Sequence, residues 1–121
     1  PRLTMSQAAD KRQSGHQTFA ARYSSFRGHE INSGDILALE NGRLSFIDRD
    51  VTRAAYKLTR KLVKNLKGSA GYVTVLYGSD VSDDKASELE NIMKSKLSSL
   101  DINFVKGGQP VYYYIISVES E

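Results

Sequence analysis

The sequence predicts an α/β sandwich in which two main helices pack on a mixed β-sheet of about five or six strands. Two long segments carry apolar residues at helical spacing, and short segments rich in β-branched and aromatic residues lie before, between and after them. The expected order is strand, β-hairpin, helix, strand, helix, strand, strand. The length of 121 residues corresponds to one domain. We expect residues 14–121 to form it, and residues 1–13 to be a weak helix or a mobile N-terminal segment.

The first half of this domain predicts a strand followed by a β-hairpin. Residues 16–26 alternate apolar and polar side chains, which is typical of a strand. In residues 35–48, Asn41 and Gly42 suit a two-residue type I′ turn, because both tolerate the positive φ that its central positions require. Folding about this turn is expected to place four apolar residues on one face, as the pairs Leu39 with Leu44 and Leu37 with Phe46.

Two helices with clear end signals follow the hairpin. Residues 50–68 form the first, with Asp50 as the N-cap and Gly68 ending the helix in the left-handed conformation. Residues 79–100 contain the second, for which Ser82 is the expected N-cap. The residues expected to be buried in the first helix are Val51, Ala54, Ala55, Leu58, Leu62 and Leu66. Those in the second are Ala86, Leu89, Met93, Leu97 and Leu100.

Three further strands are expected at residues 71–78, 102–107 and 111–119. In the last of them both alternating sets of side chains are apolar, which is typical of a strand that is covered on both faces. We therefore expect this strand at or near the middle of the sheet. Pro110 is expected at its first position, where a missing N–H does little harm.

Residue chemistry alone points to no catalytic or metal site. The chain has no cysteine, which excludes disulfides and thiolate chemistry and fits a reducing cytoplasm. His16 and His29 lack companions at ligand spacing, and the glycine pairs match no phosphate-binding motif. No segment approaches the ~18 apolar residues of a membrane span. The chain begins at Pro1 rather than Met, which indicates a piece of a longer protein.

The charge distribution leaves two binding functions open. The net charge is +3, and the first helix is basic while residues 80–90 are mostly acidic. A nucleic-acid-binding module is one alternative, but Tyr56 is the single aromatic residue among the basic ones, where base stacking needs several. A small-molecule-binding regulatory domain is the other, with residues 112–114 and the turn at 107–110 as its pocket. A buried strand explains the three tyrosines more simply.

Several short motifs resemble the C-terminal region of the FakA (YloV) family, the kinase components of bacterial two-component fatty acid kinases. Near the end of the chain the matching residues are Tyr77, Gly78, Asp80, Val81, Ser82, Gly107, Gly108, Gln109, Pro110, Tyr112, Tyr114, Ser117, Val118 and Glu119. Upstream they are Gly15, Thr18, Ala20, Arg22, Ile31, Gly34, Asp35 and Gly42. Tyr23 departs from the pattern, since the family has an acidic residue there.

The resemblance implies a DegV-like fold and a place as the second half of the FakA C-terminal region. In this family a dihydroxyacetone-kinase-like domain elsewhere in the chain binds ATP and Mg²⁺. It phosphorylates the carboxylate of a fatty acid, held by the partner FakB, to an acyl phosphate for phospholipid synthesis. This chain has none of the nucleotide-binding motifs, so the resemblance implies a non-catalytic, cytoplasmic docking module for FakB without a cofactor of its own.

Docking in this family is thought to use an acidic surface of this region against a basic surface of FakB. The exposed acids expected to take that role are Asp80, Asp83, Asp84 and Glu88. Complementary charge of this kind chiefly raises the association rate and selects the partner. The turn of Gly107, Gly108, Gln109 and Pro110 is the second motif to which the resemblance draws attention.

Overall fold

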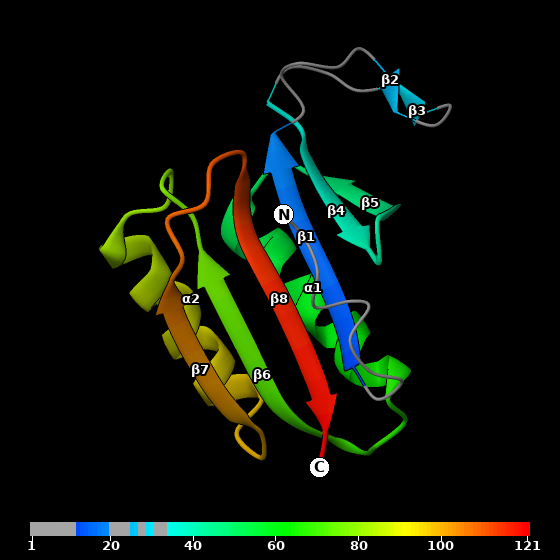
Figure 1. Ribbon diagram of the computed structural model, residues 1–121, viewed down its shortest axis with the longest axis vertical. Helices are drawn as coiled ribbons and strands as arrows, with labels where there is room; N and C mark the ends of the chain where they lie inside the picture. The colour runs from blue at the N-terminus through cyan, green and yellow to red at the C-terminus, as the bar shows by residue number, and fades with distance from the viewer. Residues whose placement is uncertain (1–11, 20–24, 27–28, 31–33) are drawn as a thin grey trace.

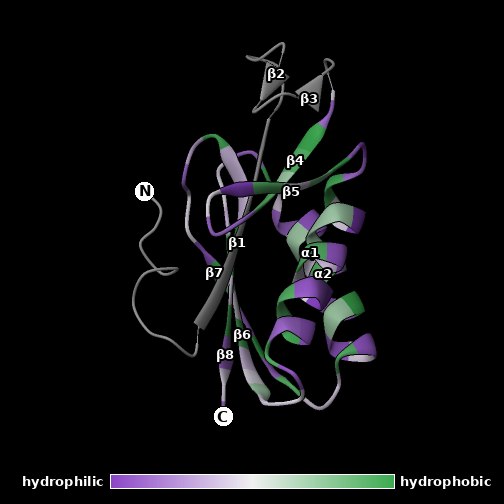
Figure 2. Cartoon of the chain, turned by 90° about the vertical axis from the view of Figure 1, so that its right-hand side faces the viewer, coloured by the Kyte–Doolittle hydropathy of each residue, from purple (hydrophilic) through white to green (hydrophobic). Residues whose placement is uncertain are grey.

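The computed structural model describes residues 12–19, 25–26, 29–30 and 34–121, with side chains from residue 34 onward. Its main sheet has six strands in the order β5-β4-β1-β8-β6-β7, and α1 (Val51–Asn65) and α2 (Asp83–Lys96) lie together on one face (Figures 1 and 2). The strands are β1 (Arg12–Phe19), β4 (Ile36–Glu40), β5 (Arg43–Asp48), β6 (Ala70–Tyr77), β7 (Asp101–Lys106) and β8 (Tyr112–Ser120). The short strands β2 (Ser25–Phe26) and β3 (His29–Glu30) pair with each other. Only β6 and β7 pair in parallel among the described strands, so the predicted mixed α/β fold is confirmed.

The last strand lies inside the sheet, as predicted. β8 pairs antiparallel with β1 on one side and with β6 on the other (Figure 1). Tyr114, Ile116 and Val118 are fully buried in the core beneath the two helices. Ile115 is also buried, and it points to the opposite face because side chains alternate along a strand. Both alternating sets are therefore shielded in the middle of the strand, which explains why apolar residues occur in both sets.

The hairpin forms about the predicted turn but with a different register. Asn41 and Gly42 have φ values of 51° and 83°, as a type I′ turn requires. Leu39 pairs with Leu44 as expected, whereas the predicted pair of Leu37 with Phe46 is wrong. The observed pairs are Ala38 with Phe46 and Leu37 with Ile47. A β-bulge next to Ala38 inserts one extra residue in β5, which turns Phe46 toward the helices.

The helix ends follow the local signals in the sequence. The Arg53 N–H donates to Asp50 Oδ1 at 3.2 Å, and the Lys85 N–H donates to Ser82 Oγ at 3.1 Å. α1 ends earlier than predicted, at Asn65, and the first residue after it with a left-handed φ is Lys67 at 53°, followed by Gly68 at 89°. These bonds satisfy N–H groups that a helix leaves without a partner at its start. The fully buried apolar residues of the two helices are Ala54, Ala55, Leu58 and Leu62, then Ala86, Leu89 and Met93.

The start of the chain departs from the prediction. β1 begins at Arg12, which pairs with Glu119 of β8, so the expected helix or mobile segment over residues 1–13 is wrong for its last two residues. Residues 1–11 lie outside the described part. The polar residues at the start of β1 give no alternating pattern, and their pairing with β8 determines the strand there. Of the strand expected at residues 16–26, the first four residues are in β1 and the last two in β2.

Candidate functional site

Two turns at one end of the sheet hold each other in place. One follows β6 and leads into α2, and the other is the turn at 107–110 that leads into β8. The Gly78 N–H donates to the Tyr113 carbonyl at 2.8 Å, and the Ser79 N–H donates to the Gln109 carbonyl at 3.0 Å. The Gly107 N–H donates to the Tyr77 carbonyl at 2.9 Å. The start of α2 is therefore fixed relative to the start of β8.

The side chain of Gln109 is part of this connection. Its amide nitrogen donates to the carbonyl of Leu76 at 3.1 Å and to the carbonyl of Tyr112 at 3.3 Å. Both facing atoms are acceptors, so the NH₂ group, and not the oxygen, must point toward them. Gln109 thus has a structural role, because it ties the end of β6 to the beginning of β8.

The glycines of the two turns have different reasons: close backbone approach at Gly78, a side-chain contact at Gly107 and a positive φ at Gly108. A Cβ on Gly78 would lie 2.6 Å from the Gln109 carbonyl oxygen and even closer to that of Tyr112. A Cβ on Gly107 would collide with the Gln109 side chain. Gly108 has a φ of 70°, which favours glycine. The resemblance drew attention to these positions, and their steric reason is now clear.

Pro110 does not occupy the first position of the last strand, contrary to the prediction. β8 begins two residues later, at Tyr112. Val111 lies between them with a φ of 72°, which is far from an extended conformation. The Tyr112 N–H donates to the Pro110 carbonyl at 2.8 Å, so the chain makes one more tight bend before it enters the sheet.

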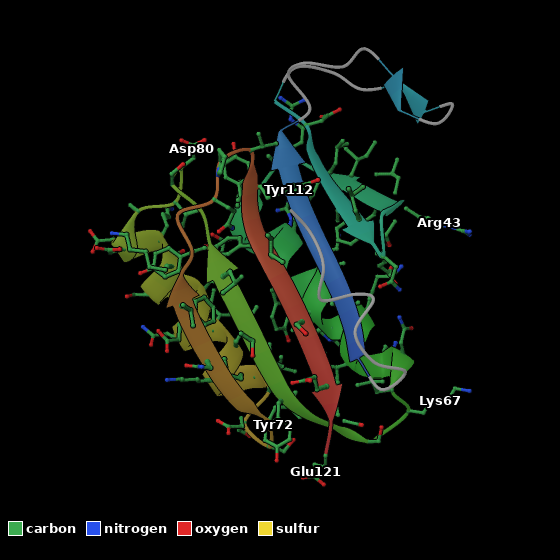
Figure 3. All side chains as sticks on the ribbon, in the orientation of Figure 1. Arg43, Lys67, Tyr72, Asp80, Tyr112 and Glu121 are labelled. Carbon is green, nitrogen blue, oxygen red and sulfur yellow. The ribbon has the colours of Figure 1, made fainter. Side chains whose placement is uncertain are left out.

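The four acids expected at a docking surface are all exposed and lie around the start of α2. Asp80 is in the preceding loop, at the same end of the sheet as Tyr112 (Figure 3). Asp83 and Asp84 are in the first turn of α2, and Glu88 follows one turn later. We call Asp80, Asp83, Asp84 and Glu88 the acidic group.

The acidic group is only partly neutralised. Asp83 accepts a hydrogen bond from the Tyr77 hydroxyl at 3.1 Å and lies 3.6 Å from Lys106 Nζ. Glu88 pairs with Lys85 at 3.5 Å. Within the ranges that the structure describes, the carboxylates of the other two members, Asp80 and Asp84, have no ion pair or hydrogen bond. Both of these side chains are exposed.

A cleft of about 330 Å³ lies between the beginnings of the two helices. We call it the α1–α2 cleft. It is formed by the start of α1, the loop before α2 and the start of β8, and the residues that matter below are Arg49, Asp50, Asp80, Lys85, Tyr113 and Tyr114. No residue of the turn at 107–110 lines it. Sequence reasoning missed this cleft, because it arises only when the two helix starts meet at one end of the sheet.

The hydroxyl of Tyr114 is an exception among the buried polar groups of the described residues. Tyr114 is fully buried, and its hydroxyl has no hydrogen-bond partner in the described part of the chain. Burial, together with the nearby charge of Glu88 and the Tyr77 side chain, raises the pKa of Tyr114 to about 12. Burial and the charge of Asp80 likewise raise the pKa of Tyr113. Burial is the larger cause in both cases, and both tyrosines keep neutral hydroxyl groups.

The cations at the cleft and at the start of α1 already have carboxylate partners. Arg49 lies 3.5 Å from the buried Asp35. Arg53 binds Asp48 with two nitrogens, Nε at 3.0 Å and Nη2 at 2.5 Å. Hydrogen bonds from Arg53 outweigh the effect of burial and hold the pKa of Asp48 well below its usual range. These pairs fix the junction of β5 and α1 and leave little positive charge for a ligand.

Comparison with known proteins gives the family. A model of the FakA-like family, for the C-terminal domain of its fatty acid kinase component, matches residues 2–119. The chain belongs to this family. Protein YloV of Bacillus subtilis is 30% identical over 115 residues, covering 95% of this chain and 20% of that protein. An uncharacterized protein of Staphylococcus haemolyticus is 31% identical over 117 residues, with the same coverage. The chain thus spans about a fifth of the length of these curated relatives.

In this member of the FakA-like family, the basic helix has part of its charge paired within the domain, while Arg60, Lys64 and Lys67 are exposed. Lys57 lies 3.5 Å from Asp48, and Lys61 lies 3.2 Å from Glu40. Burial opposes ionisation of Glu40, but hydrogen bonds from Ser45 and Lys61 outweigh it and lower the pKa of Glu40. Much of the charge expected to attract nucleic acid is therefore paired within the domain.

Two further features bear on the chemistry open to this FakA-like domain. Among the described residues, no group of three or more His, Cys, Asp or Glu side chains is placed to hold a metal ion. In the same part of the chain, no helix is long and apolar enough to cross a membrane.

Proposed function

We propose that this chain is the non-catalytic docking domain of a fatty acid kinase and that it binds a FakB (DegV-type) fatty-acid-binding protein. A kinase domain elsewhere in a longer chain would bind ATP and Mg²⁺ and phosphorylate the fatty acid carboxylate to an acyl phosphate for phospholipid synthesis. Membership of the family supports a place in such a kinase, and the coverage of about a fifth of the relatives is compatible with one domain of several. The proposal places the protein in the cytoplasm.

The observation that carries this proposal is the acidic group at the start of α2. Two of its exposed carboxylates have no partner within the described residues. The backbone that carries the group is held rigidly, because the two interlocked turns fix the start of α2. Preorganised charges lose little freedom when a partner binds, and their field steers a basic partner during encounter. A basic surface on the FakB-type protein is the complement that this arrangement requires.

The test compares charge reversals at two places in the full-length kinase. Asp84→Lys is expected to weaken binding of the FakB-type protein about tenfold at low salt, with a smaller effect at high salt, because the interaction is between exposed charges. The double change Asp83→Lys and Asp84→Lys is expected to weaken it further. Asp101→Lys is the matched control, since it reverses another exposed acid at the start of β7. Equal affinity for the Asp84 and Asp101 variants would refute the docking surface.

A small-molecule-binding regulatory domain is the second candidate, and one observation favours it. The volume of the α1–α2 cleft, about 330 Å³, lies at the lower end of the range for small-molecule sites. Such a domain would bind its ligand with no partner protein present. Thermal unfolding of the chain in the presence of fatty acids and nucleotides would reveal it as a rise in melting temperature.

A further inference from the structure

We propose that the α1–α2 cleft receives a basic side chain, an arginine or a lysine, of the docked partner protein, and that the Tyr114 hydroxyl and the Asp80 carboxylate bind it. The inference rests on the docking function proposed above and identifies the chemical anchor of the contact. It goes beyond a general acidic surface because it assigns one pocket and one buried acceptor.

The Tyr114 hydroxyl is buried without a hydrogen-bond partner among the described residues. Buried polar side chains nearly always have a hydrogen-bond partner, and an exception in a folded domain asks for an explanation. Tyr114 lines the cleft, its ring is fixed in the core beneath the helices, and its hydroxyl has no partner in the described part of the chain. A phenol oxygen can accept a hydrogen bond from an incoming N–H group. A ligand with N–H donors would therefore complete the site.

The balance of charge at the cleft favours a cationic ligand. Its two cations, Arg49 and Lys85, already have the carboxylate partners Asp35 and Glu88. The Asp80 carboxylate has no such partner among the described residues, and Asp50 uses one oxygen to cap α1. An anionic ligand would face both of these carboxylates. A cation would instead be attracted to them.

The size of the cleft and the type of its polar groups fit the end of an arginine side chain. A cleft of about 330 Å³ has room for the end of one long side chain. Arginine presents five N–H donors in a planar fork, so it can contact a hydroxyl and a carboxylate together. Arginine is also enriched among the few residues that dominate protein–protein affinity, typically in desolvated pockets near the centre of the contact. The cleft and the acidic group share Asp80, which makes the pocket continuous with the proposed docking surface.

The experiment measures binding of the FakB-type protein to the full-length kinase. Tyr114→Phe removes only the hydroxyl and keeps the ring in the core, so folding is preserved. It is expected to weaken binding about tenfold, as loss of a hydrogen bond to a charged group does. Asp80→Asn is expected to weaken binding by a similar factor. The variant with both Tyr114→Phe and Asp80→Asn is expected to lose less binding free energy than the sum of the two single losses. Tyr72→Phe is the control, because Tyr72 is an exposed tyrosine that does not line the cleft.

The possible results separate this inference from the docking proposal. If the unchanged kinase does not bind the FakB-type protein, both fail. If Asp84→Lys weakens binding while Tyr114→Phe binds as tightly as Tyr72→Phe, docking stands and the anchor is wrong. If inorganic phosphate raises the melting temperature of the unchanged kinase but not of Tyr114→Phe, the cleft takes an anion and the inference is overturned. Support requires in addition that one Arg→Ala or Lys→Ala variant of the partner loses affinity and no longer responds to Tyr114→Phe.

Discussion

Replacement of Gln109 tests whether the turn before β8 is a structural element. Gln109 donates two hydrogen bonds to backbone carbonyls, one at the end of β6 and one at the beginning of β8. Gln109→Ala removes both bonds and leaves two acceptors without this donor. Each bond contributes about 0.5–1.5 kcal/mol, and the bond of 3.3 Å lies at the weak end. We therefore expect a loss of about 2 kcal/mol in the free energy of unfolding.

Gln109→Glu is expected to be worse than Gln109→Ala. The carboxylate would place an acceptor against two carbonyl oxygens, so it adds repulsion to the loss of the bonds. For a domain of this size, a loss of about 2 kcal/mol lowers the melting temperature by roughly 6–10 °C. The order of stability should be wild type, then Gln109→Ala, then Gln109→Glu.

The assay is urea unfolding followed by circular dichroism, with the free energy extrapolated to water for each variant. Asn103→Ala serves as the control, because Asn103 is an exposed amide on β7, and its variant should stay within about 0.5 kcal/mol of the wild type. A Gln109→Ala protein as stable as this control would refute the structural role. If that variant also lost affinity for the partner, Gln109 would belong to the binding surface instead.

Three further changes have defined outcomes. Tyr114→Phe should raise the free energy of unfolding by about 1 kcal/mol in urea, since it removes a buried hydroxyl without a partner in the described part; a loss of stability would show that the hydroxyl is hydrogen-bonded. Gly78→Ala should keep the domain from folding at 25 °C, because the added Cβ would collide with the Tyr112 carbonyl. The variant should then show no cooperative urea transition, and a normal transition would contradict this. Asp48→Asn should cost about 2 kcal/mol at pH 7, through the lost charged bonds from Arg53. The pKa of Asp48 is lowered by folding, so its contribution is complete above about pH 5 and is lost as the pH falls toward 2. A difference between wild type and Asp48→Asn that does not shrink over this range would contradict the assignment.

Features that depend on neighbouring residues were predictable from the sequence. The positive φ of Asn41 and Gly42 and the capping bonds of Asp50 and Ser82 are decided within a few residues. The central place of β8 was also predictable, because burial on both faces leaves an apolar residue at nearly every position.

Features that depend on distant segments were not predictable in the same way. The bulge that turns Phe46 toward α1 leaves no trace in the apolar pattern, since Ile47 fills the place expected for Phe46. β1 begins at Arg12 because β8 supplies backbone partners there, although its residues are polar. The α1–α2 cleft joins Arg49 and Lys85, which come from the starts of two different helices. The Tyr114 hydroxyl has no hydrogen-bond partner among the described residues, and this depends on how distant segments pack around it in the core.

The most direct test of the docking proposal is sedimentation velocity of this chain with a purified FakB-type protein at low and moderate salt. The proposal predicts a complex at low salt whose population falls as salt screens the acidic group. It also predicts no transfer of phosphate from ATP by the chain alone. A FakB-type protein that binds the full-length kinase but forms no complex with this chain at either salt concentration would contradict it.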